Sequence, residues 1–201
     1  MQDWYYADHR DLLKWGVLIL LARQYRLSRI IQIAYKRPSL FPKIDLGGQE
    51  KELPSEVCSH FRDINNITVL RDEISISVFD KFFEDRKAYQ EAVIQYLGDL
   101  AGESRLVFLD PDTGLEPAGR PKLEHVLDKE ALAIWSELKT REVFAFYQHK
   151  TNRSGKPWIE EKRIQLEKAL KVKEGTVHVG KSMKMVNDVV IFYAKKPLLK
   201  A

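Results

Sequence analysis

The sequence is short of cysteine and of long apolar runs, and each shortage excludes a class of protein. Cys58 is the one cysteine among 201 residues, so neither an internal disulfide nor a thiolate zinc site can hold the fold together. The longest apolar run, residues 17–22, falls far below the roughly 20 residues that a membrane span needs. The start also lacks the basic and then apolar order of a signal peptide. The sequence therefore predicts a cytoplasmic protein with no membrane contact.

The composition is that of a folded globular chain, with 44% hydrophobic and 31% charged residues. This length predicts a single α/β domain over residues 1–201. The net charge of +4 is unevenly distributed, because residues 139–201 hold 15 Lys and Arg against 6 Asp and Glu, a net charge of +9. Such a segment would attract a phosphate backbone, although lysines on solvated helix faces give the same count. Charge alone leaves nucleic-acid contact open.

Apolar periodicity and turn residues divide the chain into alternating elements. Helices are predicted over 8–25, 82–97, 122–138 and 159–172. Strands are predicted over 29–35, 67–70, 106–109, 143–147, 176–179 and 189–193, and residues 74–79 fit either a strand or a loop. A strand, a helix and a strand in succession imply a parallel, right-handed crossover. The fold class is therefore α/β, with a mostly parallel sheet and a C-terminal antiparallel hairpin.

An acidic turn follows the predicted strand 106–109 and is the sharpest candidate site. It reads Asp110-Pro111-Asp112-Thr113-Gly114-Leu115-Glu116. Ligands of α/β proteins bind at the carboxyl ends of parallel strands, where Asp110 could accept a hydrogen bond from a substrate amine. Alternatively, Asp110, Asp112 and Glu116 could hold Mg²⁺. These residue types also form ordinary turns, and their place after a buried strand favours the functional interpretation.

A second polar segment follows the strand 143–147. Parallel strands joined by one crossover would bring His149 close to Asp110, where it could act as a general base or metal ligand; a lone histidine in a polar loop is also commonly solvated. The loop beyond it offers phosphate and base contacts. The residues predicted for such contacts are Lys150, Asn152, Arg153, Lys156 and Trp158.

The acidic turn resembles the catalytic motif of S-adenosylmethionine-dependent amino-methyltransferases, whose usual form is Asp-Pro-Pro followed by an aromatic residue. The segment His9-Arg10-Asp11-Leu12-Leu13-Lys14-Trp15-Gly16 is similar to N-terminal segments of Dam-like adenine methyltransferases and large-subunit rRNA adenine methyltransferases. The resemblance implies a three-layer Rossmann-like fold that acts on or binds nucleic acid. It also implies a catalytic Asp110, with S-adenosylmethionine bordered by His9, Lys14 and Asp110.

The sequence departs from this family at two places. Asp112 replaces the second proline, and Thr113 and Gly114 replace the aromatic residue of the motif. The first predicted strand also lacks the glycine-rich turn that lets a backbone approach the cofactor, and Tyr35 or Lys36 would crowd that place. A degenerate cofactor site is therefore part of this hypothesis.

Two alternatives stand beside the methyltransferase-like hypothesis, so the sequence leaves open whether the chain is an enzyme. Asp112 with Gln148-x-Lys150 resembles the pattern of PD-(D/E)XK nucleases, which would make the chain a metal-dependent phosphodiesterase using Mg²⁺. That pattern usually spans an antiparallel hairpin, whereas residues 122–138 favour a parallel crossover. The other alternative is a non-catalytic binding module of a larger assembly.

Overall fold

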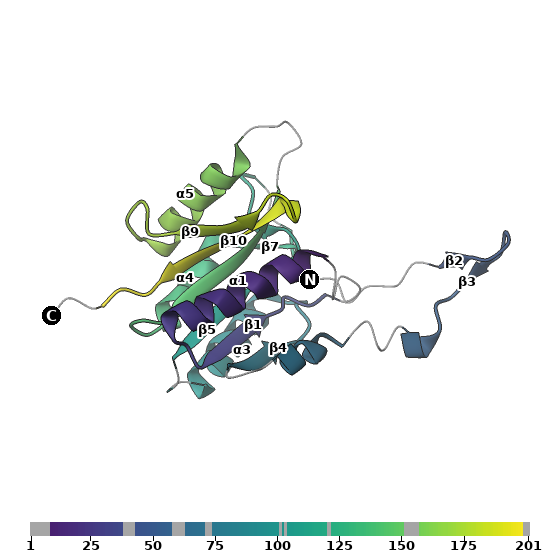
Figure 1. Cartoon of the computed structure of the whole chain (residues 1–201), viewed down its shortest axis with the longest axis horizontal. Coiled ribbons are helices and arrows are strands. Elements are labelled where there is room, and N and C mark those ends of the chain that lie inside the picture. The colour runs from purple at the N-terminus through teal and green to yellow at the C-terminus, as the bar shows by residue number, and fades with distance from the viewer. Residues whose placement is uncertain are drawn as a thin grey trace.

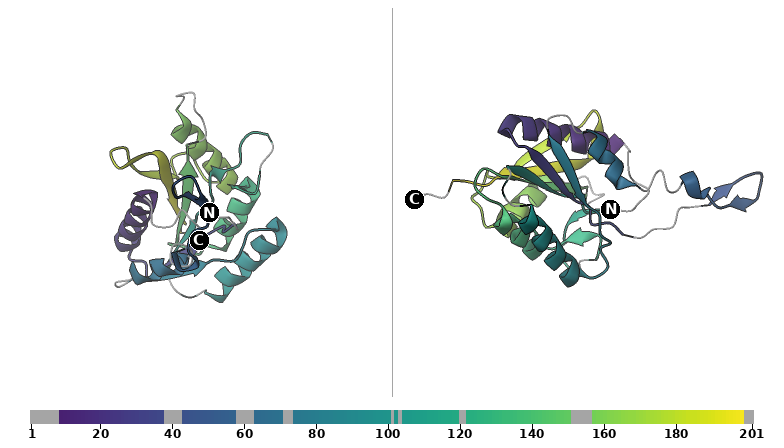
Figure 2. Two further views of the ribbon diagram at one scale, coloured as in Figure 1. Left: turned by 90° about the vertical axis from the view of Figure 1, so that its right-hand side faces the viewer. Right: turned by 90° about the horizontal axis from the view of Figure 1, so that it is seen from below.

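A six-stranded sheet with helices on both faces forms the body of the protein (Figures 1 and 2). The computed structural model describes residues 9–37, 43–57, 63–70, 74–100, 102, 104–119, 122–150 and 157–198. The strand order across the sheet is β4-β1-β5-β8-β10-β9. These strands are β1 (Arg29–Ile33), β4 (Ser75–Phe79), β5 (Arg105–Leu109), β8 (Val143–His149), β9 (His178–Ser182) and β10 (Val186–Lys195).

Four neighbouring strands of this sheet run parallel. β1 pairs with β4 and β5, and β5 pairs with β8, so that these four strands end at the same side of the sheet, here called the carboxyl edge. β10 runs antiparallel to both β8 and β9 and closes the sheet. The architecture is therefore a Rossmann-like α/β fold with a mostly parallel sheet and a C-terminal antiparallel hairpin, as the sequence predicted.

The helices form two layers, one on each face of the sheet (Figure 2). α1 (His9–Tyr25) and the 3-10 helix η2 (Ile64–Leu70) cover one face, and α3 (Arg86–Asp99), α4 (Asp128–Glu137) and α5 (Trp158–Leu170) cover the other. Alternate residues of β5 enter the two cores, with Phe108 facing α1 and Leu109 facing the opposite layer. Burial on both faces explains why β5 is apolar throughout its length.

The prediction of a strand over residues 67–70 is wrong, because these residues belong to η2. Ile64 and Ile67 are the buried residues of this helix, and their spacing of three matches one 3-10 turn. Asp63 accepts a hydrogen bond from the backbone of Asn65 at 3.0 Å and thereby favours a turn at this point. Residues 74–79, which fitted either a strand or a loop, contain β4.

The helix predicted over 82–97 begins later, at Arg86, since Asp85 caps it by accepting a hydrogen bond from the Ala88 backbone at 2.8 Å. Residues before α4 form β7 (His125–Val126), which pairs in parallel with β6 (Gly114–Leu115). This small ladder attaches the acidic turn to the segment leading into α4.

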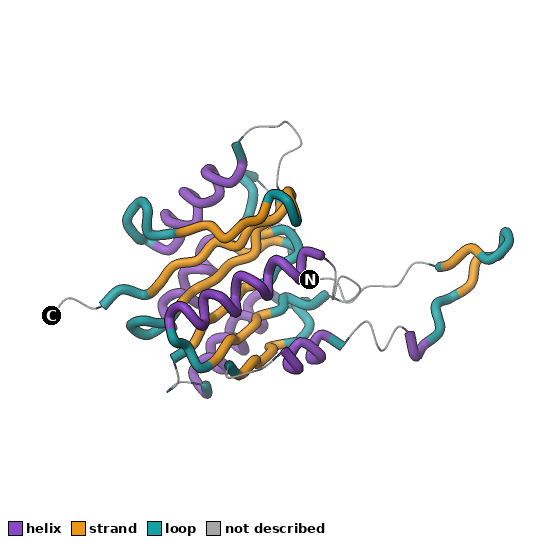
Figure 3. Tube along the Cα trace, viewed as in Figure 1, coloured by secondary structure: helices purple, strands orange, loops and turns teal. Residues whose placement is uncertain are grey.

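A hairpin arm extends away from the body after β1 (Figures 1 and 3). It contains β2 (Ile44–Asp45) and β3 (Glu50–Lys51), which pair antiparallel. No helix among the described residues is long and apolar enough to cross a membrane.

Candidate functional site

A buried ammonium group joins the two segments that the sequence analysis singled out. The Lys14 Nζ on α1 donates to both oxygens of Asp110, at 3.3 and 3.1 Å, and lies 2.5 Å from Asp11 Oδ1. Gln32 on β1 donates to Asp110 Oδ2 at 2.8 Å. All four side chains are buried. They form one polar centre at the carboxyl edge, where β5 ends beside β1.

Two pKa values in this centre are shifted upward, for different reasons. Burial by itself disfavours the charged form of Lys14, but the carboxylates of Asp110 and Asp11 outweigh that effect and raise its pKa well above the usual range. The centroid of the Tyr147 ring lies 5.1 Å from Lys14 Nζ. Burial raises the pKa of its hydroxyl, although Lys14 acts in the opposite direction. Lys14 therefore stays charged and Tyr147 stays neutral at ordinary pH.

Asp110 is closed to solvent, with 1% of its surface exposed. The sequence predicted that this carboxylate accepts a hydrogen bond from a substrate amine, but its two oxygens already accept three hydrogen bonds from Lys14 and Gln32. In this conformation the chain's own ammonium group occupies the place that the hypothesis assigned to the substrate.

Asp112 takes part in an ion pair across the carboxyl edge. Arg37, beyond β1, donates to Asp112 Oδ2 through Nε at 2.7 Å and through a terminal guanidinium nitrogen. The proposed catalytic or metal-binding Asp112 is therefore paired with a cation. The sequence pattern gives no sign of this pair, because the two residues lie 75 positions apart.

Gln148 holds the acidic turn against β8 instead of facing a reaction site. Its buried amide accepts from the Leu115 backbone at 2.9 Å and donates to the carbonyl oxygens of Thr113 and His149 at 3.1 and 2.8 Å. Gly114 has a φ of 122°, and a Cβ there would lie 2.4 Å from the Gln148 side chain. Glycine is thus required where the turn approaches the strand. The nuclease pattern had assigned Gln148 a catalytic position, which these structural hydrogen bonds do not support.

The alternative magnesium site also lacks support in the structure. Glu116 Oε1 accepts a hydrogen bond from the Asp128 backbone at 2.9 Å, at the start of α4, while Asp110 and Asp112 are engaged with cations. Within the described ranges, no group of three or more His, Cys, Asp or Glu side chains could hold a metal ion.

His149 lies at the end of β8, on the strand next to that of Asp110, as the sequence predicted. Its Nε2 is 3.3 Å from Asp188 Oδ2, and its Nδ1 is 3.2 Å from the Lys150 carbonyl oxygen. Arg10 on α1 donates to the same Asp188 carboxylate at 2.6 Å. Both ring nitrogens of His149 therefore have partners within the chain, which disfavours its role as a general base.

The predicted nucleic-acid contacts are only partly described by the structure. Asn152, Arg153 and Lys156 lie outside the described residues. Lys150 is exposed, as a phosphate contact requires. Trp158, in contrast, is the first residue of α5, is 7% exposed and packs in the core, so the prediction that its ring stacks on a base is not supported.

The residues after β1 do not fit S-adenosylmethionine in the position that the family resemblance implies. A buried tyrosine, Tyr35, stands at a φ of 46° where a glycine turn would allow the backbone to approach the cofactor. The centroid of its ring lies 5.2 Å from the ring centroids of both Phe83 and Tyr89. The chain then continues beside the segment after β4, with the Phe83 backbone donating to the Lys36 carbonyl at 2.7 Å. His9, the other residue proposed to border the cofactor, is exposed at the start of α1.

No family model and no curated protein matches this sequence. Among solved structures, the chain is similar to a fibrillarin/Nop5p complex, with a TM-score of 0.39, 11% identity, and coverage of 84% of this chain and 72% of that chain. It is also similar to an O-methyltransferase family protein from Burkholderia thailandensis (TM-score 0.39, 8% identity, 94% and 58% covered) and to PigF with SAH (TM-score 0.37, 12% identity, 94% and 57% covered). The chain thus spans less than three fifths of the last two proteins.

Proposed function

We propose that this chain is a methyltransferase-like protein that binds nucleic acid at the carboxyl edge of its sheet, and that its methyl-donor site is degenerate. The observation that carries the proposal is the closed contact between Lys14 and Asp110. An amine-accepting carboxylate must be reachable by the amine, whereas this one is satisfied from within the chain. The buried Tyr35 in place of a glycine turn supports the same conclusion for the cofactor.

Exposed cations at the carboxyl edge support nucleic acid as the ligand. Lys150 follows β8, Lys181 lies in β9, and Lys184 lies in the turn between β9 and β10. β9 is parallel to β8, since both are antiparallel to β10, so these three lysines lie at one side of the sheet. Lysines grouped in this way contact phosphate groups without reading the base sequence.

A working methyltransferase is the second candidate, and two observations favour it. Lys14 and Asp110 carry the two resembling motifs and do meet in the fold. Asp80 directly follows β4, which is the second strand of the six-stranded sheet along the chain. In nucleotide-binding folds, an acidic residue after the second strand hydrogen-bonds a ribose. One Asp80 oxygen already accepts from Asn65 at 2.9 Å.

Two titrations test the proposal. Calorimetry of the full chain with S-adenosylmethionine should give no binding heat, since the cofactor position is filled by Tyr35. Fluorescence anisotropy with a labelled single-stranded RNA should show binding that weakens steeply with salt, because phosphate contacts release counterions. Saturable binding of S-adenosylmethionine would instead establish the second candidate, and a lack of RNA and DNA binding at low salt would refute the nucleic-acid proposal.

A further inference from the structure

An apolar groove of about 610 Å³ runs between α1 and η2 on the outer face of the protein. Leu12 and Leu20 line it from α1 and are 64% and 65% exposed, and Leu70 lines it from η2 and is 52% exposed. Gly16 lies between the two α1 leucines on the same side of the helix, which leaves room for an incoming chain at the middle of the groove. Contiguous exposed leucines of this kind mark an interaction site.

The hairpin arm, residues 43–57, carries apolar side chains that need such a site. Ile44 and Leu46 are 40% and 62% exposed, and the arm extends away from the body (Figures 1 and 3). Gly47 and Gly48, with φ of 65° and 84°, form its turn. A two-stranded hairpin is marginally stable in water by itself. The arm would therefore gain stability by packing against another surface.

The charges of the arm specify the kind of surface. Asp45 lies directly opposite Glu50 in the β2–β3 ladder, and like charges in this position destabilise a hairpin. The arm holds four acidic residues and two lysines, so it is acidic overall. A basic surface would relieve the repulsion between Asp45 and Glu50.

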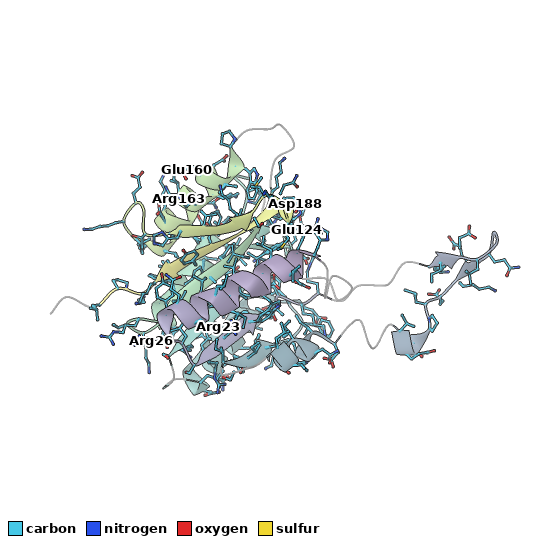
Figure 4. All side chains as sticks on the ribbon, in the orientation of Figure 1. Arg23, Arg26, Glu124, Glu160, Arg163 and Asp188 are labelled. Carbon is cyan, nitrogen blue, oxygen red and sulfur yellow. The ribbon has the colours of Figure 1, made fainter. Side chains whose placement is uncertain are left out.

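Arginines provide that basic surface at one end of the groove. Arg23 lines the groove, and Arg26 lines an adjoining cavity of about 430 Å³ that shares Ile19, Arg23 and Leu70 with it. Figure 4 shows both arginines at the C-terminal end of α1. The groove thus combines an apolar floor with a basic end, which complements the apolar and acidic arm.

We propose that the arm of one copy of this chain docks in the α1–η2 groove of a second copy, with Leu46 on the groove leucines and Asp45 and Glu50 facing Arg23 and Arg26. If each arm enters the other copy's groove, the contact is made twice and closes a twofold symmetric dimer. The inference is independent of the proposed function.

Disulfide trapping tests the contact between copies. In a Cys58→Ser background, chains with Leu46→Cys and chains with Leu20→Cys, each with a different tag, are mixed and oxidised. A disulfide-linked pair carrying both tags is expected, and Leu123→Cys, an exposed leucine outside the groove, serves as the control for random collision. Light scattering of the unmodified chain should give the mass of a dimer.

Charge reversal separates docking from a purely local role of the arm. Glu50→Lys removes the like-charge pair within the arm and should not harm an isolated hairpin, but it should weaken the dimer about two- to fivefold, as expected for one exposed ion pair. Leu20→Glu should weaken it further, with an unchanged circular dichroism spectrum. A monomer in scattering with no disulfide above the Leu123→Cys control would overturn the proposal. A chain with both cysteines that links only within itself would overturn it as well, because the arm would then occupy its own groove.

Discussion

The Lys14 ammonium group lies 3.1 Å from the Asp110 carboxylate, although the two residues are 96 positions apart in the sequence. The lysine comes from α1, which covers one face of the sheet, and the carboxylate directly follows β5. Because both groups are buried, this contact is a structural ion pair as well as the centre of the candidate site. Its removal has consequences that can be measured without a known substrate.

Lys14→Met should destabilise the fold by about 3 to 5 kcal/mol, because Asp110 would be left buried without its cation. Urea denaturation of the two proteins measures this difference. Lys87→Met is the matched control, since the Lys87–Glu91 pair is exposed, and its change should stay within about 0.5 kcal/mol. Equal effects of the two substitutions would show that Lys14 does not balance a buried carboxylate.

Gly114→Ala should destabilise the protein more than Gly119→Ala. Both glycines have positive φ, 122° and 138°, so an alanine is strained at either position, at a cost of about 1 to 3 kcal/mol. At Gly114 the new Cβ would also press on the Gln148 side chain at 2.4 Å, whereas nothing lies within 4 Å at Gly119. The difference between the melting temperatures of the two variants isolates the destabilisation that comes from the clash with Gln148. Similar melting temperatures would contradict the close packing of the turn on β8.

Arg10→Gln should make the stability of the protein less sensitive to acid. The hydrogen bond from Arg10 lowers the pKa of Asp188, and the charges of Arg10 and His149 lower it further. A carboxyl group with a lowered folded pKa stabilises the fold above its ordinary value of 3.8, and this contribution disappears as the pH falls through the folded pKa. Without Arg10 that contribution is smaller at neutral pH.

Urea midpoints measured between about pH 2 and pH 6 test this linkage. The curves of the parent and of Arg10→Gln should converge at the acid end and separate above the ordinary Asp188 value. Lys43→Gln, which removes the exposed partner of Glu52 on the arm, is the control. Parallel curves for the parent and Arg10→Gln over the whole range would refute the prediction.

Replacing Lys181 and Lys184 by glutamine should reduce the salt dependence of nucleic-acid binding. Each phosphate contact contributes about 0.7 to the slope of log affinity against log salt for a single strand, so the double variant should lose about 1.4. Lys171 and Lys173 lie between the end of α5 and the start of β9. Because β9 is parallel to β8, it begins at the edge opposite the carboxyl edge, and replacement of these two lysines should leave the slope unchanged. Anisotropy titrations with one RNA at several salt concentrations give all three slopes. Equal losses for the two pairs would mean that charge acts without a defined binding edge.

The sequence was informative wherever local pattern decides structure. The continuous apolar run of β5, the helical spacing of α1 and the reversed hairpin at the end were all confirmed. The strand predicted over residues 67–70 was wrong, since a short apolar run fits a strand and a 3-10 turn equally well. The missing glycine after β1 did predict the crowding by Tyr35, because a side chain in place of a glycine turn keeps the backbone away from a cofactor.

The sequence by itself determined the order of the elements, the parallel crossover and the placement of Asp110 and His149 at neighbouring strand ends, because periodicity and turn chemistry act over a few residues. Tertiary structure decided what those side chains touch. Lys14 and Gln32 reach Asp110, Arg37 reaches Asp112, and Asp188 reaches His149. Each partner comes from a distant part of the chain, and a sequence pattern carries no distance between segments that meet only when α1 and the strands pack together.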